Sequence, residues 1–244
     1  MAGSAGEKKQ VDQINVNQFY FMVIIIGNQK GGAGKSTLTL LLANYLTEPR
    51  QKPVTVIDMD YQQSLAQKFE RAKVLENAEP YAVHALALDQ FAKRKKELKD
   101  NPEVLFLIDL PGKLDDDGLI EVFKTADLAI CPFSYDEFSF ESTVFFSLVL
   151  KRIKPAITII YVPNRIKANV KYEIQSDVNE QLTLLGEVTQ AIPDRIDFQR
   201  ANTYQTPDSV NPLLLPVFDH IYKKHLEQTY ERNQNPGRPD AQQD

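Results

Sequence analysis

The sequence predicts an α/β fold in which a doubly wound, mostly parallel β-sheet is flanked by helices on both faces. Short, β-branched apolar runs alternate with longer amphipathic segments, which is the pattern of repeated βαβ units. The runs are apolar at consecutive positions, as expected for strands that are buried on both faces. Ligands of such sheets sit beyond the carboxyl ends of the strands. We therefore expect the functional residues directly after the apolar runs.

The expected elements follow one another along a single domain at 20–231. We expect strands at 21–27, 53–58, 104–109, 127–133, 156–162 and 187–192, with an edge strand at 80–86. We expect helices at 35–47, 62–75, 89–99, 139–153, 171–184 and 213–231. The polar segment 1–19 is predicted to be a flexible lead-in, and the Pro-, Gly- and Gln-rich segment 232–244 a disordered tail.

Composition narrows the classes of protein. A net charge of −5 means that nucleic-acid binding would need a local basic patch. The single cysteine, Cys131, excludes an internal disulfide, and its apolar surroundings predict a small buried thiol. With three histidines, we expect no His/Cys metal cluster. Neither a secretory leader nor an apolar run of roughly 18 residues is recognisable, so we expect a cytoplasmic protein that does not bind membranes.

A glycine-rich stretch, GNQKGGAGKST at 27–37, joins the first expected strand to the first expected helix. Its glycines allow backbone N–H groups to approach phosphate oxygens closely, and the dipole of the following helix favours an anion. Lys35 would reach the β- and γ-phosphates, the Ser36 hydroxyl would ligate Mg²⁺, and Thr37 would contact the α-phosphate. The residues expected to bind nucleotide here are Lys30, Gly31, Gly32, Ala33, Gly34, Lys35, Ser36 and Thr37.

This stretch departs from the ordinary phosphate loop, G-x-x-x-x-G-K-[ST], which requires glycine at position 29. The chain has Gln29 there, followed by a second lysine, Lys30. K-G-G-x-G-K-[ST] is the deviant Walker A motif, and the chain resembles the ParA/MinD family of P-loop ATPases, especially its ParA-type and MipZ-type members. In that family, the lysine matching Lys30 reaches across a nucleotide-sandwich dimer to the phosphates of the other subunit. The resemblance implies an ATP-dependent homodimer with weak, dimer-dependent ATP hydrolysis, in which Lys35 acts in cis and Lys30 in trans.

Acidic residues follow the second expected strand. In strand geometry, Asp58 and Asp60 would point to the same side, close to one Mg²⁺–phosphate centre. The resemblance implies that Asp58 lies near the Mg²⁺ ion and that Asp60 positions or activates the attacking water. Tyr61 replaces a proline that many members carry, although MipZ-like members lack it too. Alternatively, the two aspartates face solvent or cap the next helix.

A third carboxylate, Asp109, ends the strand LFLID, which is similar to a Walker B strand. A carboxylate that emerges there can hold a Mg²⁺-bound water. The expected metal residues are therefore Ser36, Asp58 and Asp109. Gly112 matches the family's switch, which senses the γ-phosphate through a backbone N–H.

The sequence favours adenine over guanine. A GTPase carries N-K-x-D after a late strand, whereas this chain has Asn164, Arg165 and, at the aspartate position, Lys167. The resemblance implies that Asn164 contacts adenine and that the backbone of Ile192, Pro193 and Asp194 flanks the base. Alternatively, Asn164 is an ordinary loop cap. The expected cofactors are ATP and Mg²⁺.

The predicted partner of the ATP-bound dimer is non-specific DNA. The resemblance to ParA-type and MipZ-type members implies this partner, because they bind DNA without sequence specificity through exposed cations. It also implies association with the nucleoid in the ATP-bound state. The candidates here are Arg195, Arg200, Lys223 and Lys224, with further basic runs at 93–99 and 151–154. Basic runs are also ordinary solvated helix faces.

The preferred hypothesis is thus a ParA/MipZ-like ATPase that partitions or positions DNA or a protein complex, assisted by a protein stimulator or cargo adaptor. One alternative is an ATP-gated protein-binding module of a conjugation, secretion or positioning apparatus without a DNA role. Another is a MinD-like ATPase that binds membrane through an amphipathic C-terminal helix. The apolar stripe of the last expected helix would allow this, but the helix also needs that stripe to pack against the rest of the fold. A metabolic enzyme of the same superfamily is the third.

Overall fold

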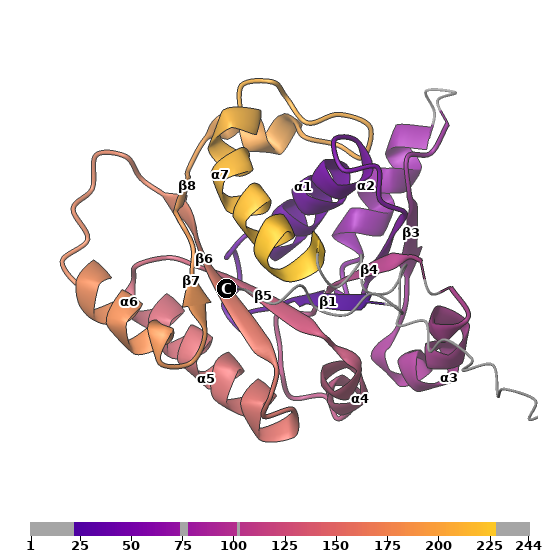
Figure 1. Cartoon of the computed structure of the whole chain (residues 1–244), viewed down its shortest axis with the longest axis horizontal. Helices are drawn as coiled ribbons and strands as arrows, with labels where there is room; N and C mark the ends of the chain where they lie inside the picture. The colour runs from indigo at the N-terminus through magenta and orange to yellow at the C-terminus, as the bar shows by residue number, and fades with distance from the viewer. Residues whose placement is uncertain (1–21, 74–77, 102, 228–244) are drawn as a thin grey trace, which may run out of the picture.

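A computed structural model describes residues 22–73, 78–101 and 103–227 of the chain and contains the predicted architecture (Figure 1). Its centre is an eight-stranded sheet in the order β3-β2-β4-β1-β5-β6-β7, with β8 paired to β6. Every pairing is parallel. The strands are β1 Met22–Ile26, β2 Val54–Asp58, β3 Ala82–Ala85, β4 Leu105–Asp109, β5 Leu128–Phe133, β6 Thr158–Ile166, β7 Glu187–Val188 and β8 Ile192–Pro193.

Helices cover both faces of this sheet (Figure 1). One face carries α1 Lys35–Thr47, α2 Ser64–Ala72 and α7 Asn211–Ile221. The other carries α3 Leu88–Lys99, α4 Gly118–Thr125, α5 Glu137–Ile153 and α6 Gln175–Thr183. Successive β1 residues alternate between the two cores, Ile24 and Ile26 on the α1 side and Val23 and Ile25 on the α5 side. Each fully buried aliphatic side chain contributes about 1.5–3 kcal/mol, so the middle strands are stabilised from both faces.

The strand register brings the carboxyl ends of β1, β2 and β4 to one edge. Asp109 of β4 is aligned with Ile26 of β1 on one side and with Asp58 of β2 on the other. Gly27, the residue after β1, begins the glycine-rich loop at this same edge. The loop and two of the predicted carboxylates therefore share one end of the sheet.

The structure differs from the prediction in several elements. Helix α4 was not predicted, and α6 begins four residues later than expected. The single strand expected at 187–192 is two short strands on β6, with β7 opposite Ile160 and Tyr161 and β8 opposite Asn164 and Ile166. Helix α7 gives way at Tyr222 to a π-helix, Tyr222–Leu226.

Some expectations fall on residues outside the described part of the chain. These are the lead-in at 1–19, the tail at 232–244 and the end of the last helix at 228–231. Cys131 is fully buried in β5, as predicted. Among the described residues, the helices are all too short or too polar to cross a bilayer.

Candidate nucleotide-binding site

The glycine-rich loop has a backbone that requires glycine at two positions. Gly32 has a φ of +78° and Gly34 a φ of +89°, which is the left-handed region that L side chains rarely adopt. A Cβ at Gly34 would also lie 2.4 Å from Asn164 Nδ2. Gly34 is thus needed both for its backbone conformation and for the close approach of Asn164.

Asn28 anchors the start of the loop to its neighbours in space. This fully buried side chain donates from Nδ2 to Pro132 O at 2.8 Å and to Thr143 Oγ1 at 2.9 Å. Its Oδ1 accepts the backbone N–H of Lys30 at 3.0 Å. Asn28 therefore fixes the position of the Lys30 backbone in the loop. The sequence analysis missed this residue, although an Asn directly after a buried strand is a polar group that needs partners.

Lys35 and Gly112 lie together at the phosphate end of the site. Lys35 is the first residue of α1, and only 8% of it is exposed. A Cβ added to Gly112 would lie 3.7 Å from Lys35 Nζ. The residue expected to sense the γ-phosphate is thus in contact range of the lysine expected to bind it.

Ser36 and Asp109 meet directly beneath the loop. Ser36 Oγ donates to Asp109 Oδ2 at 2.6 Å, and Thr39 Oγ1 lies 3.4 Å from Asp109 Oδ1. The pKa of Asp109 is raised to about 7, chiefly because the carboxyl group is buried; the hydrogen bond from Ser36 opposes this rise, and the nearby carboxylate of Asp58 adds to it. The fold therefore brings together Ser36, Asp58 and Asp109, the three side chains that were predicted as metal residues.

Asp58 also does what the alternative hypothesis described, because its carboxylate caps α2. Its Oδ2 accepts the backbone N–H groups of Leu65 and Ala66, each at 3.0 Å, and its Oδ1 accepts that of Asp60 at 3.1 Å. Burial raises the pKa of Asp58, and these N–H groups oppose the rise. A carboxylate in this position stabilises a helix N-terminus.

The strand argument for Asp60 was wrong, because β2 ends at Asp58. Asp60 lies instead in the following turn, where its Oδ1 accepts the N–H of Gln62 at 2.9 Å. Next to it, the exposed Tyr61 donates its hydroxyl to Asp116 Oδ2 at 3.1 Å. Asp116 accepts the N–H of Gly118 at the start of α4. Tyr61 therefore connects the turn of Asp60 to the segment that follows Gly112.

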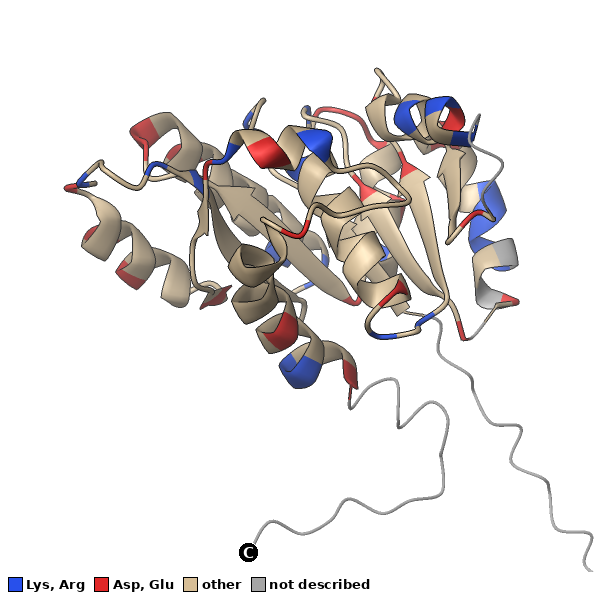
Figure 2. Ribbon diagram, turned by 90° about the horizontal axis from the view of Figure 1, so that it is seen from above, with Lys and Arg blue, Asp and Glu red and all other residues tan. Residues whose placement is uncertain are grey.

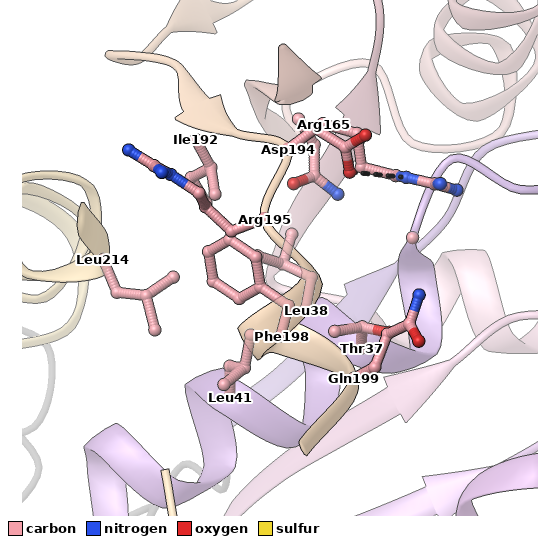
Figure 3. A pocket seen from close by; sticks show the side chains of 12 residues that line it. Thr37, Leu38, Leu41, Arg165, Ile192, Asp194, Arg195, Phe198, Gln199 and Leu214 are labelled. Carbon is pink, nitrogen blue, oxygen red and sulfur yellow. Dashed lines mark hydrogen bonds and ion pairs between the residues drawn. The ribbon is translucent and has the colours of Figure 1, made fainter. Parts of the chain in front are cut away.

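A cavity of about 180 Å³ opens beside the loop (Figure 3). Its apolar walls come from α1, from α7 and from a 3₁₀ helix, Ile196–Arg200. In Figure 3 the ring of Phe198 lies among the side chains of Leu38, Leu41 and Leu214. The lining residues are Gly34, Thr37, Leu38, Leu41, Asn164, Arg165, Ile192, Asp194, Arg195, Phe198, Gln199 and Leu214. An apolar pocket with a few polar groups next to a phosphate loop suits a planar base.

Asn164 and Arg165 hold the loop against this cavity. The buried Asn164 donates from Nδ2 to Ala33 O at 2.9 Å, so this donor contacts the loop itself. Arg165, with a φ of +60° at the bulge of β6, donates from Nη1 to Gly32 O at 3.0 Å and lies 3.5 Å from Asp194. The sequence analysis used Arg165 only to argue against guanine and missed its contact with the loop.

Lys30 lies apart from the other phosphate-loop groups. Its Nζ is 3.7 Å from Asp136 Oδ1 and 5.3 Å from the centre of the Phe138 ring, and the side chain is 35% exposed. Asp136 is the N-cap of α5, where it accepts the N–H of Ser139. Lys30 is therefore held at the start of α5 by two side chains that face solvent.

The candidate DNA-binding cations differ in whether they form an ion pair with a neighbouring carboxylate. Arg195 is exposed and lines the cavity, while Arg200 pairs with Asp197 at 3.0 Å. Lys223 is exposed, and Lys224 pairs with Glu187 at 2.9 Å. Figure 2 shows Lys and Arg interspersed with Asp and Glu. The cations thus do not gather into one basic face in this view.

The loop geometry and the base-sized cavity beside it define a nucleotide-binding protein of the phosphate-loop class. Comparison with known families makes this specific. Residues 24–207 match the CobQ/CobB/MinD/ParA nucleotide binding domain, and the chain belongs to this family. A search of curated protein sequences found no match.

Solved structures share the fold at low sequence identity. A plasmid partition protein from Borrelia burgdorferi, bound to AMPPNP, is 21% identical with a TM-score of 0.62, over 84% of this chain and 99% of that one. A variant of McdA from Cyanothece in complex with ATP is 16% identical with a TM-score of 0.64, over 84% and 96%. MinD in the MinC:MinD cell division complex of Aquifex aeolicus is 20% identical with a TM-score of 0.61, over 91% and 100%.

Proposed function

We propose that the protein is an ATPase in which Mg-ATP closes a symmetric dimer, and in which hydrolysis opens it again. The observation that carries this proposal is the position of Lys30. Its ammonium group contacts the half-exposed Asp136 and the exposed ring of Phe138. An exposed ion pair of this kind is worth at most about 1 kcal/mol. Lys30 is therefore free at little cost to reach a nucleotide held by a second copy of the chain.

Within one subunit, the residues fit a nucleoside triphosphate. The left-handed glycines open a cradle that a Cβ would fill, and Lys35 would contact the β- and γ-phosphates from the helix start. Adenine would occupy the cavity beside Asn164, flanked by the segment Ile192, Pro193 and Asp194.

Ser36 and Asp109, with Asp58 behind them, would hold Mg²⁺. The donor set fits this ion, because it prefers hydroxyl, carboxylate and water oxygens. When bound, Mg²⁺ would neutralise phosphate charge.

Asp60 is the proposed residue for positioning or activating the attacking water. It lies in the turn after β2, and its Oδ1 accepts the N–H of Gln62, which restrains the carboxylate. The Tyr61–Asp116 hydrogen bond joins this turn to the segment after Gly112. Asp60 and the proposed γ-phosphate sensor would therefore move together.

For the partner of the dimer, we propose non-specific DNA, contacted by Arg195, Arg200, Lys223 and Lys224. The support is the family and a structural relative named as a plasmid partition protein. Phosphate contacts need exposed cations without a sequence code, and Arg195 and Lys223 are exposed. Arg200 is also 73% exposed despite its partner.

A second candidate, an ATP-gated protein-binding module, is favoured by one specific observation. Helix α5 exposes Phe138, Phe145 and Leu148, which are 71%, 49% and 54% accessible. Their spacing of seven and three residues places them along one side of a helix. Exposed apolar groups gathered on one side are typical of protein interaction sites. This stripe begins at Phe138, the residue whose ring lies under Lys30.

The test is size-exclusion chromatography with light scattering on Asp60→Ala, which should bind ATP but not turn it over. We expect a monomer without nucleotide, a dimer with Mg-ATP, and co-elution of the dimer with a short DNA duplex at low salt. Normal hydrolysis by Asp60→Ala, or a monomer in saturating Mg-ATP, would refute the ATPase cycle.

The partner is decided by two further variants. Arg195→Glu with Arg200→Glu should leave the dimer intact and abolish DNA binding. If the wild-type dimer ignores DNA at low salt, the DNA role fails. In that case, Phe145→Ser with Leu148→Ser tests the stripe, because it should abolish capture of a protein partner without affecting ATP binding.

A further inference from the structure

Three potential metal ligands converge at the edge of the sheet away from the phosphate loop. A carboxylate oxygen of Glu187 and imidazole nitrogens of His220 and His225 all lie within 4.8 Å of one another. His225 Nε2 is 2.8 Å from Glu187 Oε2, and His220 Nε2 contacts Glu187 Oε1. Two of the three histidines in the chain therefore share one carboxylate. The sequence analysis, which expected no His/Cys metal cluster, did not predict this arrangement.

The π-helix is what brings the two histidines to the same side. In an α-helix, five residues advance the chain by 500°, which would leave His220 and His225 about 140° apart. The π-helix Tyr222–Leu226 begins two residues after His220 and contains His225, and the N–H of Glu227 donates to the carbonyl of Tyr222 in an i→i+5 hydrogen bond. Such wide turns bring five residues closer to a full turn, and they are frequent at functional sites.

Glu187 is placed beneath the histidines by the sheet. It begins β7, which pairs with β6 through Ile160. The preceding residue, Gly186, allows this approach, because a Cβ there would lie 2.3 Å from Ile159 O. The carboxylate is thus held by the sheet edge and the imidazoles by the C-terminal helix.

We propose that Glu187, His220 and His225 form a site for a divalent transition metal, with Zn²⁺ as the best match. Zn²⁺ binds imidazole nitrogen and carboxylate oxygen at about 2.0–2.2 Å, and two His with one Glu leave a fourth position for water. Ligands of a tetrahedral Zn²⁺ lie about 3.3 Å apart, so the observed spacing needs only small side-chain movements. Lys224, whose Nζ is 2.9 Å from Glu187 Oε1, competes with the metal for this carboxylate.

Such a metal would join β7 to the end of α7. Helix α7 also carries Leu214, a wall of the proposed base cavity. The metal would therefore stabilise the position of one wall of that cavity. The inference is independent of the proposed ATPase cycle, because it involves neither the loop nor its carboxylates.

The experiment is a Zn²⁺ titration of untagged, nucleotide-free, full-length protein in competition with a chromophoric chelator. We expect one Zn²⁺ per chain and a raised melting temperature, since a ligand that binds only the folded state stabilises it. His220→Ala and His225→Ala should each weaken binding by about tenfold or more. Lys224→Met should strengthen it. The matched control is His84→Ala, which removes the remaining histidine from β3, the opposite edge strand, and should bind as the wild type does.

Other outcomes would overturn the site. If wild-type protein binds no Zn²⁺, the cluster is an ion-pair network alone. If both histidine variants bind as tightly as His84→Ala does, Zn²⁺ is held elsewhere. Circular dichroism of each variant is the control that tests whether the variant is folded. A Co²⁺ visible spectrum that is present in wild type and His84→Ala, and absent from His225→Ala, reports the ligands directly.

Discussion

Lys30 Nζ lies 3.7 Å from Asp136 Oδ1, so the second lysine of the loop is paired with the N-cap of α5. If Lys30 serves a second subunit, Lys30→Ala should leave ATP binding to the monomer within about threefold of wild type. Its ATP turnover should fall on the order of 10³-fold, as when a charge supplied in trans is removed. Fluorescent-nucleotide binding and phosphate release measure the two effects. Unchanged turnover would remove Lys30 from the mechanism.

Asp136→Asn tests the resting position of the same lysine. Asparagine is as good an N-cap as aspartate, so α5 should be retained while the charge that holds Lys30 is lost. An exposed pair is worth up to about 1 kcal/mol, so the ATP concentration for half-maximal dimerisation should fall by up to about fivefold. Light scattering across an ATP titration measures this. An increase in that concentration would mean that Asp136 helps the dimer instead.

Gly34→Ala should weaken nucleotide binding without unfolding the chain. The substitution combines a left-handed backbone with a Cβ 2.4 Å from Asn164 Nδ2. Strain of this kind costs about 1–3 kcal/mol, so ATP affinity should fall tenfold or more. Gly31→Ala is the matched control, since a Cβ there meets nothing within 4 Å. Equal affinities of the two variants would contradict the loop geometry.

Phe198→Ala addresses the base cavity separately from the phosphate end. Stacking of a base on an aromatic ring is worth about 1–3 kcal/mol, so the Kd for ATP should rise by about tenfold. Tripolyphosphate, which lacks a base, should compete equally well against wild type and variant. Isothermal titration with both ligands makes the comparison. A parallel loss of tripolyphosphate binding would show that Phe198 supports the loop and not the base.

Asp219 joins α7 to the end of α1. It accepts hydrogen bonds from Tyr45 Oη at 2.5 Å and Arg50 Nη2 at 2.6 Å. Burial raises the pKa of Asp219, but these hydrogen bonds outweigh it and the pKa is lowered. Because the folded-state pKa is depressed, the stabilisation is complete above the unfolded value and is lost as the pH falls through the folded value.

Asp219→Asn should therefore lower the free energy of unfolding at pH 7 by about 1 kcal/mol, since the group is partly exposed. The difference from wild type should shrink below about pH 4. Urea unfolding at both pH values measures it. Asp197→Asn, which breaks the exposed pair with Arg200, should change stability by less than about 0.5 kcal/mol. A pH-independent difference would contradict the ionic origin.

The sheet was predictable because β1, β2, β4 and β5 are apolar at consecutive positions and lie between helices. Helix α4 was not, because it has eight residues and follows a run of aspartates that is typical of a loop. The bulge of β6 opposite β8 coincides with the left-handed φ of Arg165, a conformation that an arginine seldom adopts. No local pattern indicates it.

The same distinction applies to the site. Gly34, Lys35 and Ser36 are adjacent in sequence, so one short motif predicted them. The partners of Asn28 and Arg165 are 104 and 133 residues away, and only the folded chain reveals them. His220 and His225 escaped notice because five residues is not a neighbour spacing on an α-helix.

Under the proposed function, Asp58 would have two roles that compete. Its Oδ2 serves the first turn of α2, while the family resemblance assigns the same carboxylate to the metal's surroundings. Any shift of that oxygen toward a cation would lengthen its hydrogen bonds to Leu65 and Ala66. Amide-proton exchange at these two positions would then be faster when the nucleotide site is occupied. The first turn of α2 would therefore report on ligand binding at a distance from the nucleotide itself.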